Sequence, residues 1–477
     1  MPRLSTLWFA ALVALAWAAA PSRADGVDFA REVAPIFARS CVACHGERIA
    51  LGGWRAHTAK ALLASGASGK PLIVPGKPER SGLLARLRSK DPVARMPQGD
   101  DPLPAAQVAV VERWIREGAR VGGVDPTAPL AGLGGPIAHP SAPKTYPAPV
   151  PVLAVALSPD ARLVATGGYH EVVLWNVADG GLVRRIDRLP QRIQSIRWSR
   201  DGRSLLVAGG SPGSYGEASV VAIDGVKRSV LSLFPDIALA AAWSPDERTV
   251  VAGGADASVR AVDVATGKER WRHKVHADWV TGIGFTGDGK YVASSGRDKV
   301  VKVYEAASGT LFTTYGGHNR NIGRYRGQSP VWAVAFPEGS PQVLSVGGGA
   351  WVQVWEPEKA MLETGDAGDM EERFQTRSHA RHLAHGLSGS VFAMATAGGR
   401  VFVAGEDGKV ALVDPTGAPA PKRVDVGADW IYALGTDPAG RVLAAGGYDG
   451  TVTLIDPSTG TAMRRFVAAP GWKPAGR

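Results

Sequence analysis

Residues 41–45 read Cys41-Val42-Ala43-Cys44-His45, and they contain both cysteines of the 477-residue chain. Two thiols separated by two residues and followed directly by a histidine form the attachment pattern of a c-type haem. The thiols add across the two haem vinyl groups, and the imidazole becomes an axial ligand of the iron. The pattern predicts that the N-terminal region folds around one covalently attached haem c, held by Cys41 and Cys44, with His45 as the proximal iron ligand.

Two other chemistries use closely spaced cysteines. A zinc site would need further ligands such as His57, and nothing nearby repeats the cysteine spacing. A redox-active pair of thiols is the second alternative. Because the chain has no other cysteine, a disulfide framework and a four-cysteine zinc site are excluded.

Residues 1–24 have the pattern of a secretory signal peptide. A basic start that includes Arg3 precedes an apolar run from Leu7 to Ala20, and Ser22 and Ala24 offer small residues for a cleavage site. Covalent haem is attached after export, so both motifs predict a periplasmic protein of a bacterium with no transmembrane segment after cleavage. The alternative is an uncleaved segment that anchors the protein in the membrane.

The formal net charge of +10 indicates a basic surface. Such a surface can steer an acidic redox partner, although a solvated arginine-rich surface with no such role has the same composition. No block of consecutive lysines and arginines stands out, so the sequence does not predict binding to nucleic acid.

Residues 25–121 are expected to form a small all-α haem domain. Apolar residues recur at helical spacing over residues 27–40 and again after Pro104, with Gly118 as a stop signal. The first and last helices of small cytochromes cross, so Trp114 is expected to pack between them. The apolar positions are Phe29, Val33, Ile36 and Phe37 in the first helix and Val108, Val111, Trp114 and Ile115 in the last.

Met96 is the predicted distal ligand of the haem iron. It is the only methionine between the signal peptide and the linker, in a loop where Pro97 and Gly99 can fix the backbone. A thioether ligand raises the reduction potential relative to a second imidazole. His57 is the rival ligand, and an open iron position is the third alternative.

The haem region resembles the planctomycete-type cytochrome c family over essentially its whole length. The resemblance implies that Cys41 and Cys44 carry the haem and that His45 is proximal. Met96 matches the family's Arg-Met-Pro-Pro element, except that Gln98 replaces the second proline. The shared segments are 29–37, 41–46, 51–53, 73–81, 95–97 and 112–119.

Residues 122–150 are rich in proline and glycine and predict a semi-rigid linker that contains His139. After it, a unit of about 40 residues recurs, the period of propeller blades. Each unit has an apolar strand, a turn such as Ser158-Pro159-Asp160, a second strand, a glycine turn and a third strand such as Val172-Val173-Leu174-Trp175. Residues 151–477 thus resemble a WD40-repeat β-propeller, and seven turns predict seven blades, with six or eight blades as the alternatives.

Two insertions and several aromatic residues interrupt the repeats. One insertion covers 316–330 with His318, Arg320, Arg324 and Arg326, and the other carries His379, His382 and His385. The three histidines could bind a metal, although their spacing suits one helix face poorly. The aromatic residues at the starts of first strands suggest a partner surface, although each alone suits core packing; they are Trp279, Trp332, Phe392 and Tyr432.

The sequence therefore predicts an exported electron-transfer protein whose propeller docks a redox partner. The first alternative is a redox enzyme with a catalytic site in the propeller that feeds electrons to the haem. The second is a scaffold whose haem is mainly structural. An electron carrier or interaction protein is favoured over an enzyme because no serine–histidine–aspartate set, paired carboxylates or phosphate loop is evident in the sequence.

Overall fold

A computed structural model describes most of the chain after the predicted signal peptide. The described residues are 26–42, 44–47, 49–98, 102–130, 133, 137–319, 330–337, 339–362, 380–417, 421–427 and 429–473. The signal-peptide prediction for residues 1–24 lies outside them, and so do Arg320, Arg324, Arg326 and His379.

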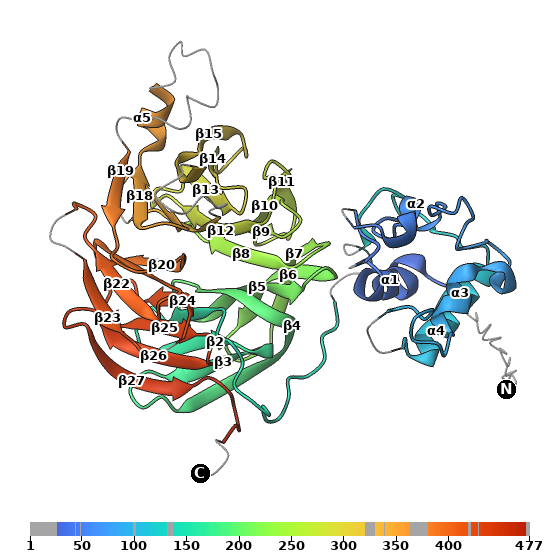
Figure 1. Ribbon diagram of the computed structural model, residues 1–477, viewed down its shortest axis with the longest axis horizontal. Helices are drawn as coiled ribbons and strands as arrows, with labels where there is room; N and C mark the ends of the chain where they lie inside the picture. The colour runs from blue at the N-terminus through green and yellow to red at the C-terminus, as the bar shows by residue number, and fades with distance from the viewer. Residues whose placement is uncertain are drawn as a thin grey trace, which may run out of the picture.

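The N-terminal region is a small helical domain, as predicted (Figure 1). Its elements are η1 (Phe29–Val33), α1 (Ala34–Ser40), η2 (Leu51–Gly53), α2 (Ala59–Leu62), η3 (Pro78–Arg80), α3 (Gly82–Leu87) and α4 (Ala105–Arg116).

The first and last helices of this domain pack against each other around aromatic side chains. Trp114 in α4 lies 5.4 Å from Phe29 and 6.0 Å from Phe37, measured between ring centroids. It is 1% exposed, and its indole N–H donates to the carbonyl of Arg120 at 2.8 Å. A buried indole with its donor satisfied in this way is a packing residue. Helix α4 ends where predicted, because Gly118 takes a φ of +94° just beyond it.

The rest of the chain is mostly β, in one seven-stranded sheet and five four-stranded sheets. The seven-stranded sheet contains β1 (Val155–Leu157), β2 (Leu163–Gly167), β3 (Tyr169–Asn176), β4 (Leu182–Trp198), β5 (Ser204–Ser211), β6 (Tyr215–Ala222) and β7 (Arg228–Phe234).

Five four-stranded sheets follow in chain order. They are β8 (Ala238–Trp243), β9 (Thr249–Gly254), β10 (Val259–Asp263) and β11 (Glu269–His273); β12 (Val280–Phe285), β13 (Tyr291–Gly296), β14 (Val301–Glu305) and β15 (Leu311–Tyr315); β16 (Val331–Ala335), β17 (Val343–Gly347), β18 (Trp351–Trp355) and β19 (Arg381–Ala384); β20 (Val391–Ala397), β21 (Arg400–Gly405), β22 (Lys409–Val413) and β23 (Lys422–Asp425); β24 (Ile431–Thr436), β25 (Leu443–Gly447), β26 (Thr451–Asp456) and β27 (Thr461–Val467). The short helices η5 (Gly317–Asn319) and α5 (Pro357–Leu362) lie at the starts of the two insertions.

A serine and an aspartate close the first hairpin in three of the repeats, at Ser158, Ser199 and Ser244. The Ser158 hydroxyl donates to Asp160 at 2.6 Å and accepts the N–H of Leu163 at 2.9 Å. Ser244 and Asp246 make the same pair of contacts in the β8–β9 turn. Such side-chain hydrogen bonds satisfy backbone donors that a turn would otherwise leave unpaired.

The structure differs from seven separate blades at the first two repeats. Strand β4 runs from Leu182 to Trp198 and pairs with β3 through its first half and with β5 through its second half. The two repeats are joined by so few residues that the chain stays extended between them and links both into one sheet. The sequence did not show this, because the first two repeats have the same pattern of strands and turns as the others and differ from them only in the connection between them.

The first strands of successive repeats contact one another in chain order. Contacts run from β1 to the second half of β4, then to β8, β12, β16, β20 and β24, and β24 contacts β1. The final strand, β27, pairs with β26 and completes the last sheet with chain from the C-terminus.

The predicted linker packs onto the first two repeats through two matching polar sites. In one, Tyr146 donates its hydroxyl to Glu171 of β3 at 2.7 Å, and Arg185 of β4 pairs with the same carboxylate at 2.6 Å. In the other, His139 Nε2 lies 3.0 Å from Glu217 of β6, which is 0% exposed and paired with Arg228 of β7. Because both glutamates lie on third strands and both arginines on fourth strands, the same position of the repeat holds the linker twice.

A serine–histidine–aspartate set is present, contrary to the expectation from sequence. His276 contacts Asp298 through Nδ1 at 2.9 Å and Ser294 through Nε2 at 2.7 Å. Ser294 is 0% exposed, and its hydroxyl donates to Tyr304 at 3.3 Å. A fully buried hydroxyl cannot reach a substrate, so the set ties strands β13 and β14 to the segment before β12. The sequence hid it because its members lie up to 22 residues apart.

A metal site at His379, His382 and His385 was only one possibility from the sequence, and His385 uses both ring nitrogens in contacts with the backbone. Its Nε2–H donates to the carbonyl of Gly349 at 2.9 Å, and its Nδ1 accepts the N–H of Leu387 at 3.1 Å. His382 is exposed on β19. Within the described residues, no three histidine, cysteine or acidic side chains are grouped so that they could hold a metal ion.

We expect acid to destabilise the β domain through His318. Burial, and to a smaller extent the charge of His382, lowers the pKa of His318 from 6.5 to about 3. Between these values the unfolded chain binds a proton that the folded chain does not, so the free energy of unfolding falls as the pH falls. The loss is up to ~1.4 kcal/mol per pH unit, or about 2 kcal/mol between pH 6.5 and pH 5.

Urea unfolding at several pH values, compared between the wild type and His318→Gln, measures this effect. The variant is expected to show a shallower pH dependence over this window, whatever its stability at pH 7. Equal slopes for the two proteins would contradict the assignment.

Candidate functional site

The turn that carries the two cysteines follows directly from helix α1. The N–H of Cys41 donates to the carbonyl of Phe37 at 3.0 Å, and the N–H of His45 donates to the carbonyl of Cys41 at 2.9 Å. The chain therefore makes one further helix-like turn, which places His45 one turn beyond Cys41. Gly46 must lack a side chain, because a Cβ there would come within 2.7 Å of the carbonyl oxygen of Val42.

The His45 imidazole is fixed in the orientation that metal ligation requires. Its Nδ1 lies 3.3 Å from the carbonyl oxygen of Trp54. Because a carbonyl oxygen only accepts, Nδ1 donates in this contact, which leaves the Nε2 lone pair of the neutral ring available. In metal-bound histidines, a hydrogen bond from the ring nitrogen that does not bind the metal sets the tautomer in this way.

Trp54 supports His45 from within the core, a role that the sequence did not reveal. Its ring lies 5.1 Å from the His45 ring, and its indole N–H donates to the carbonyl of Leu62 at 3.1 Å. Trp54 is 3% exposed and also lies 6.5 Å from Phe37. Since the contact uses a backbone carbonyl, no residue type marks it, and only the close spacing to His45 could have suggested it.

No disulfide joins the two thiols. Burial, with a smaller contribution from Cys44, raises the pKa of the Cys41 thiol to about 12. Redox-active CxxC motifs instead have a thiol of lowered pKa. The donor set and its surroundings thus fit a c-type haem: two unpaired thiols, an imidazole with a free Nε2, and an apolar core beside them.

Met96 and Cys41 both border the same hydrophobic core of the helical domain. Met96 is half-buried, and its N–H donates to the carbonyl of Arg86 at 3.1 Å. His57, the rival ligand, has a buried Nδ1 without a hydrogen-bond partner among the described atoms, and burial lowers its pKa. Both side chains remain candidates for the distal position.

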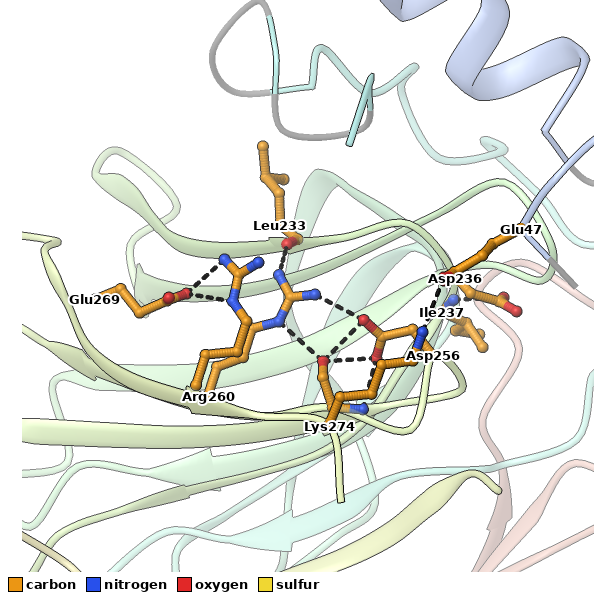
Figure 2. A network of polar contacts seen from close by, with 10 residues as sticks. Glu47, Leu233, Asp236, Ile237, Asp256, Arg260, Glu269 and Lys274 are labelled. Atoms are coloured by element: carbon orange, nitrogen blue, oxygen red, sulfur yellow. Dashed lines mark hydrogen bonds and ion pairs between the residues drawn. The ribbon is translucent and has the colours of Figure 1, made fainter. Parts of the chain in front are cut away.

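The segment of the cysteine motif lies against the β domain. Figure 1 shows the helical domain beside the ends of β6 and β7. The Ser214 hydroxyl, in the turn before β6, donates to the carbonyl of Ala38 in α1 at 3.3 Å. Lys274 Nζ reaches Glu47, two residues after His45, at 2.8 Å, beside the Asp256–Arg260 ion pair of 2.7 Å (Figure 2). The β domain therefore contacts the chain on either side of the cysteine motif.

Comparisons with known protein families agree with both parts of this architecture. Residues 41–100 match the family model for planctomycete cytochrome c. Residues 235–263, 267–305 and 421–456 match the model for the WD domain, G-beta repeat. The chain joins a planctomycete-type cytochrome c domain to WD40 repeats. We refer below to the cytochrome domain and the WD40 domain.

Individual relatives match the WD40 repeats at low identity. The chain is 27% identical over 173 residues to eukaryotic translation initiation factor 3 subunit I of Aspergillus oryzae, covering 34% of this chain and 51% of that protein. It is 24% identical over 233 residues to WD repeat-containing protein slp1 of Schizosaccharomyces pombe, covering 46% and 44%. It is 23% identical over 216 residues to actin-interacting protein 1 of Drosophila melanogaster, covering 43% and 33%. The chain thus spans about half or less of these relatives.

Together these matches fit a haem protein with a protein-interaction domain. Among the described residues, no helix is both long enough and apolar enough to cross a membrane.

Proposed function

We propose that this protein is an exported, periplasmic electron carrier with one haem c. Cys41 and Cys44 would hold the haem covalently, His45 would ligate the iron on one face, and Met96 would ligate it on the other. The bound haem supplies an iron that cycles between the ferrous and ferric states. The signal-peptide pattern of residues 1–24 supports export.

One observation carries the proposal: His45 has its Nδ1 proton bound to the Trp54 carbonyl and its Nε2 lone pair free. The Cys41–His45 turn presents this imidazole beside two unpaired thiols. A catalytic histidine would instead share a proton with a neighbouring side chain, and within the described residues the His45 ring forms no hydrogen bond with another side chain.

The WD40 domain is proposed to be a seven-bladed propeller that docks a redox partner, with its first two blades joined through β4. The cyclic contacts between first strands, including that between β24 and β1, support this closure. The two linker sites at Glu171 and Glu217 would hold the linker against the propeller, so the haem would keep a fixed place relative to the docking surface.

The distal ligand is tested by visible spectra and redox titration of the wild type and Met96→Ala. We expect Met96→Ala to keep its covalent haem, to lose the spectrum of methionine ligation, and to have a lower reduction potential. The shift should be a measurable part of the ~0.8 V range that axial ligands span. His57→Ala is the matched control and should leave the spectrum and the potential unchanged. The reverse pattern would assign the distal position to His57.

A further inference from the structure

The same dipeptide begins two repeats of the WD40 domain. Asp278-Trp279 directly precedes β12, and Asp429-Trp430 directly precedes β24. In each repeat the tryptophan carbonyl accepts the N–H of a residue just after the second strand. The distance is 2.9 Å from Arg297 to Trp279 and 2.8 Å from Tyr448 to Trp430. Arg297 and Tyr448 therefore occupy equivalent positions.

The first copy is filled by a cation of the chain itself. The guanidinium carbon of Arg297 lies 4.4 Å from the centroid of the Trp279 ring. Its Nε lies 3.7 Å from the carboxylate of Asp278. The guanidinium is thus held by an aromatic face and a carboxylate, the two groups that attract an organic cation most strongly at a protein surface.

The second copy has the same two groups, but among the described residues no cation occupies the place of Arg297; Arg465 pairs instead with Asp449 and donates to the carbonyl of Gly427. Tyr448 stands where Arg297 would be, with its ring 6.3 Å from that of Trp430. Trp430 and Tyr448 are 43% and 52% exposed, and Asp429 is exposed as well. Among the described residues, no arginine or lysine lies over either ring, and none forms an ion pair with Asp429.

Further aromatic rings extend this surface across neighbouring sheets. Tyr432 stacks on Phe392 at 5.1 Å and lies 6.0 Å from Tyr448, and Phe392 lies 5.9 Å from Trp332. Trp332, Phe392 and Tyr432 are each the second residue of a first strand, at a point where the strand register shifts. A β-bulge leaves this residue outside the ladder and redirects its side chain. The bulges explain how three successive sheets contribute half-buried rings to one surface.

A second carboxylate lies beside the rings. Glu406 follows β21, and its N–H donates to the carbonyl of Ser390, so it occupies in its sheet the position that Tyr448 occupies in the last sheet. Burial raises the pKa of Tyr432, and the charges of Tyr448, Asp429 and Glu406 raise it further. The surface around Trp430 therefore combines aromatic rings with the carboxylates of Asp429 and Glu406, in a chain whose net charge is +10.

We propose that Asp429, Trp430 and Tyr448 form a binding site for an arginine side chain of a partner protein. The incoming guanidinium would lie over Trp430 beside Asp429, as Arg297 lies over Trp279 beside Asp278, and Tyr448 would cover it from the side. The inference rests on the proposed docking role of the WD40 domain and is independent of the haem.

Indole N–H signals of the reduced, haem-loaded protein, recorded by NMR, test this site. The probe is the peptide acetyl-Gly-Arg-Gly-amide, with acetyl-Gly-Gln-Gly-amide as the neutral control, and Trp430→Phe assigns the signal. We expect the arginine peptide to shift the Trp430 signal in a saturable way and the glutamine peptide to leave it unchanged. Asp429→Asn should weaken binding about 3-fold, and Tyr448→Ala should weaken it by roughly 3- to 5-fold.

Two exchanges between the copies make the test sharper. Tyr448→Arg should fill the site internally, as in the first copy, and abolish the peptide-induced shift. Arg297→Tyr should free the first copy, so that the Trp279 signal then responds to the peptide. Glu79→Gln is the control: it removes an exposed carboxylate from the cytochrome domain and should leave the peptide-induced shift of the Trp430 signal unchanged.

Equal responses to the two peptides, or full binding by Tyr448→Arg, would overturn the proposal. The electron-transfer proposal would be unaffected by this result, because it is tested by the haem spectrum and potential. Conversely, a protein that has lost its haem but still binds the arginine peptide would show that the peptide site does not depend on the electron-transfer proposal.

Discussion

Replacing Cys41 and Cys44 together by alanine is expected to abolish covalent haem attachment completely. No other cysteine exists in the chain, so no thioether could form elsewhere. The helical domain would also lose the haem that would pack beside its apolar core, since Cys41 and Met96 both border that core. Helices of four to twelve residues pack poorly without a full core, so we expect loss of helical structure in this domain as well.

Intact-mass spectrometry and haem staining after denaturing electrophoresis measure the first effect, and circular dichroism measures the second. Met96→Ala is the control, since it should lose a ligand but keep its covalent haem. Haem that survives denaturing electrophoresis in the double cysteine variant would refute the attachment site. Free, alkylatable thiols in periplasmic wild-type protein would refute it equally.

Glu217→Ala is expected to cost about 3–5 kcal/mol of unfolding free energy, the usual penalty for breaking a buried ion pair. Glu217 is 0% exposed and is shared by Arg228 and His139. Its removal leaves a partly buried guanidinium without its partner and releases the linker from β6. Urea unfolding measures the cost, and limited proteolysis within residues 137–150 measures the release.

Matched variants separate the ion pair from general damage. Glu269→Ala removes an exposed partner of Arg272 and should cost less than about 1 kcal/mol. The double variant Glu217→Leu with Arg228→Met should recover most of the lost stability, since it leaves no unpaired buried charge. A Glu217→Ala cost below about 1 kcal/mol would contradict the role assigned to this pair.

The carboxylate of Glu217 also makes the stability of the WD40 domain sensitive to strong acid. Burial alone would raise the pKa of Glu217, but the hydrogen bond from His139 and the charge of Arg228 outweigh it and lower the pKa below 4.5. An acidic group whose pKa is lowered by folding stabilises the fold at pH values above its pKa in the unfolded chain. This contribution disappears as the pH falls through its pKa in the folded protein. It therefore acts at lower pH than the effect of His318.

The cytochrome domain could be predicted well because its chemistry is local in sequence. Five consecutive residues carry both thiols and the proximal imidazole, and helical spacing around Phe29 and Trp114 marks the helices that enclose them. Long-range contacts then decided what local patterns leave open. The Trp54 carbonyl that orients His45 has no side-chain signature, and His139 and Glu217 lie 78 residues apart.

The repeat length and the turn residues were enough to indicate strands and their order, because alternating apolar residues and serine–aspartate turns depend on neighbours a few residues away. They could not show that β4 joins two repeats or that His276 reaches Ser294 and Asp298. The positions of Trp332, Phe392 and Tyr432 did suggest a common surface, but the three bulges that redirect these side chains were visible only in the strand pairing. These features depend on which strands lie side by side. Chain folding sets that arrangement through packing between distant segments, and no short stretch of residues encodes it.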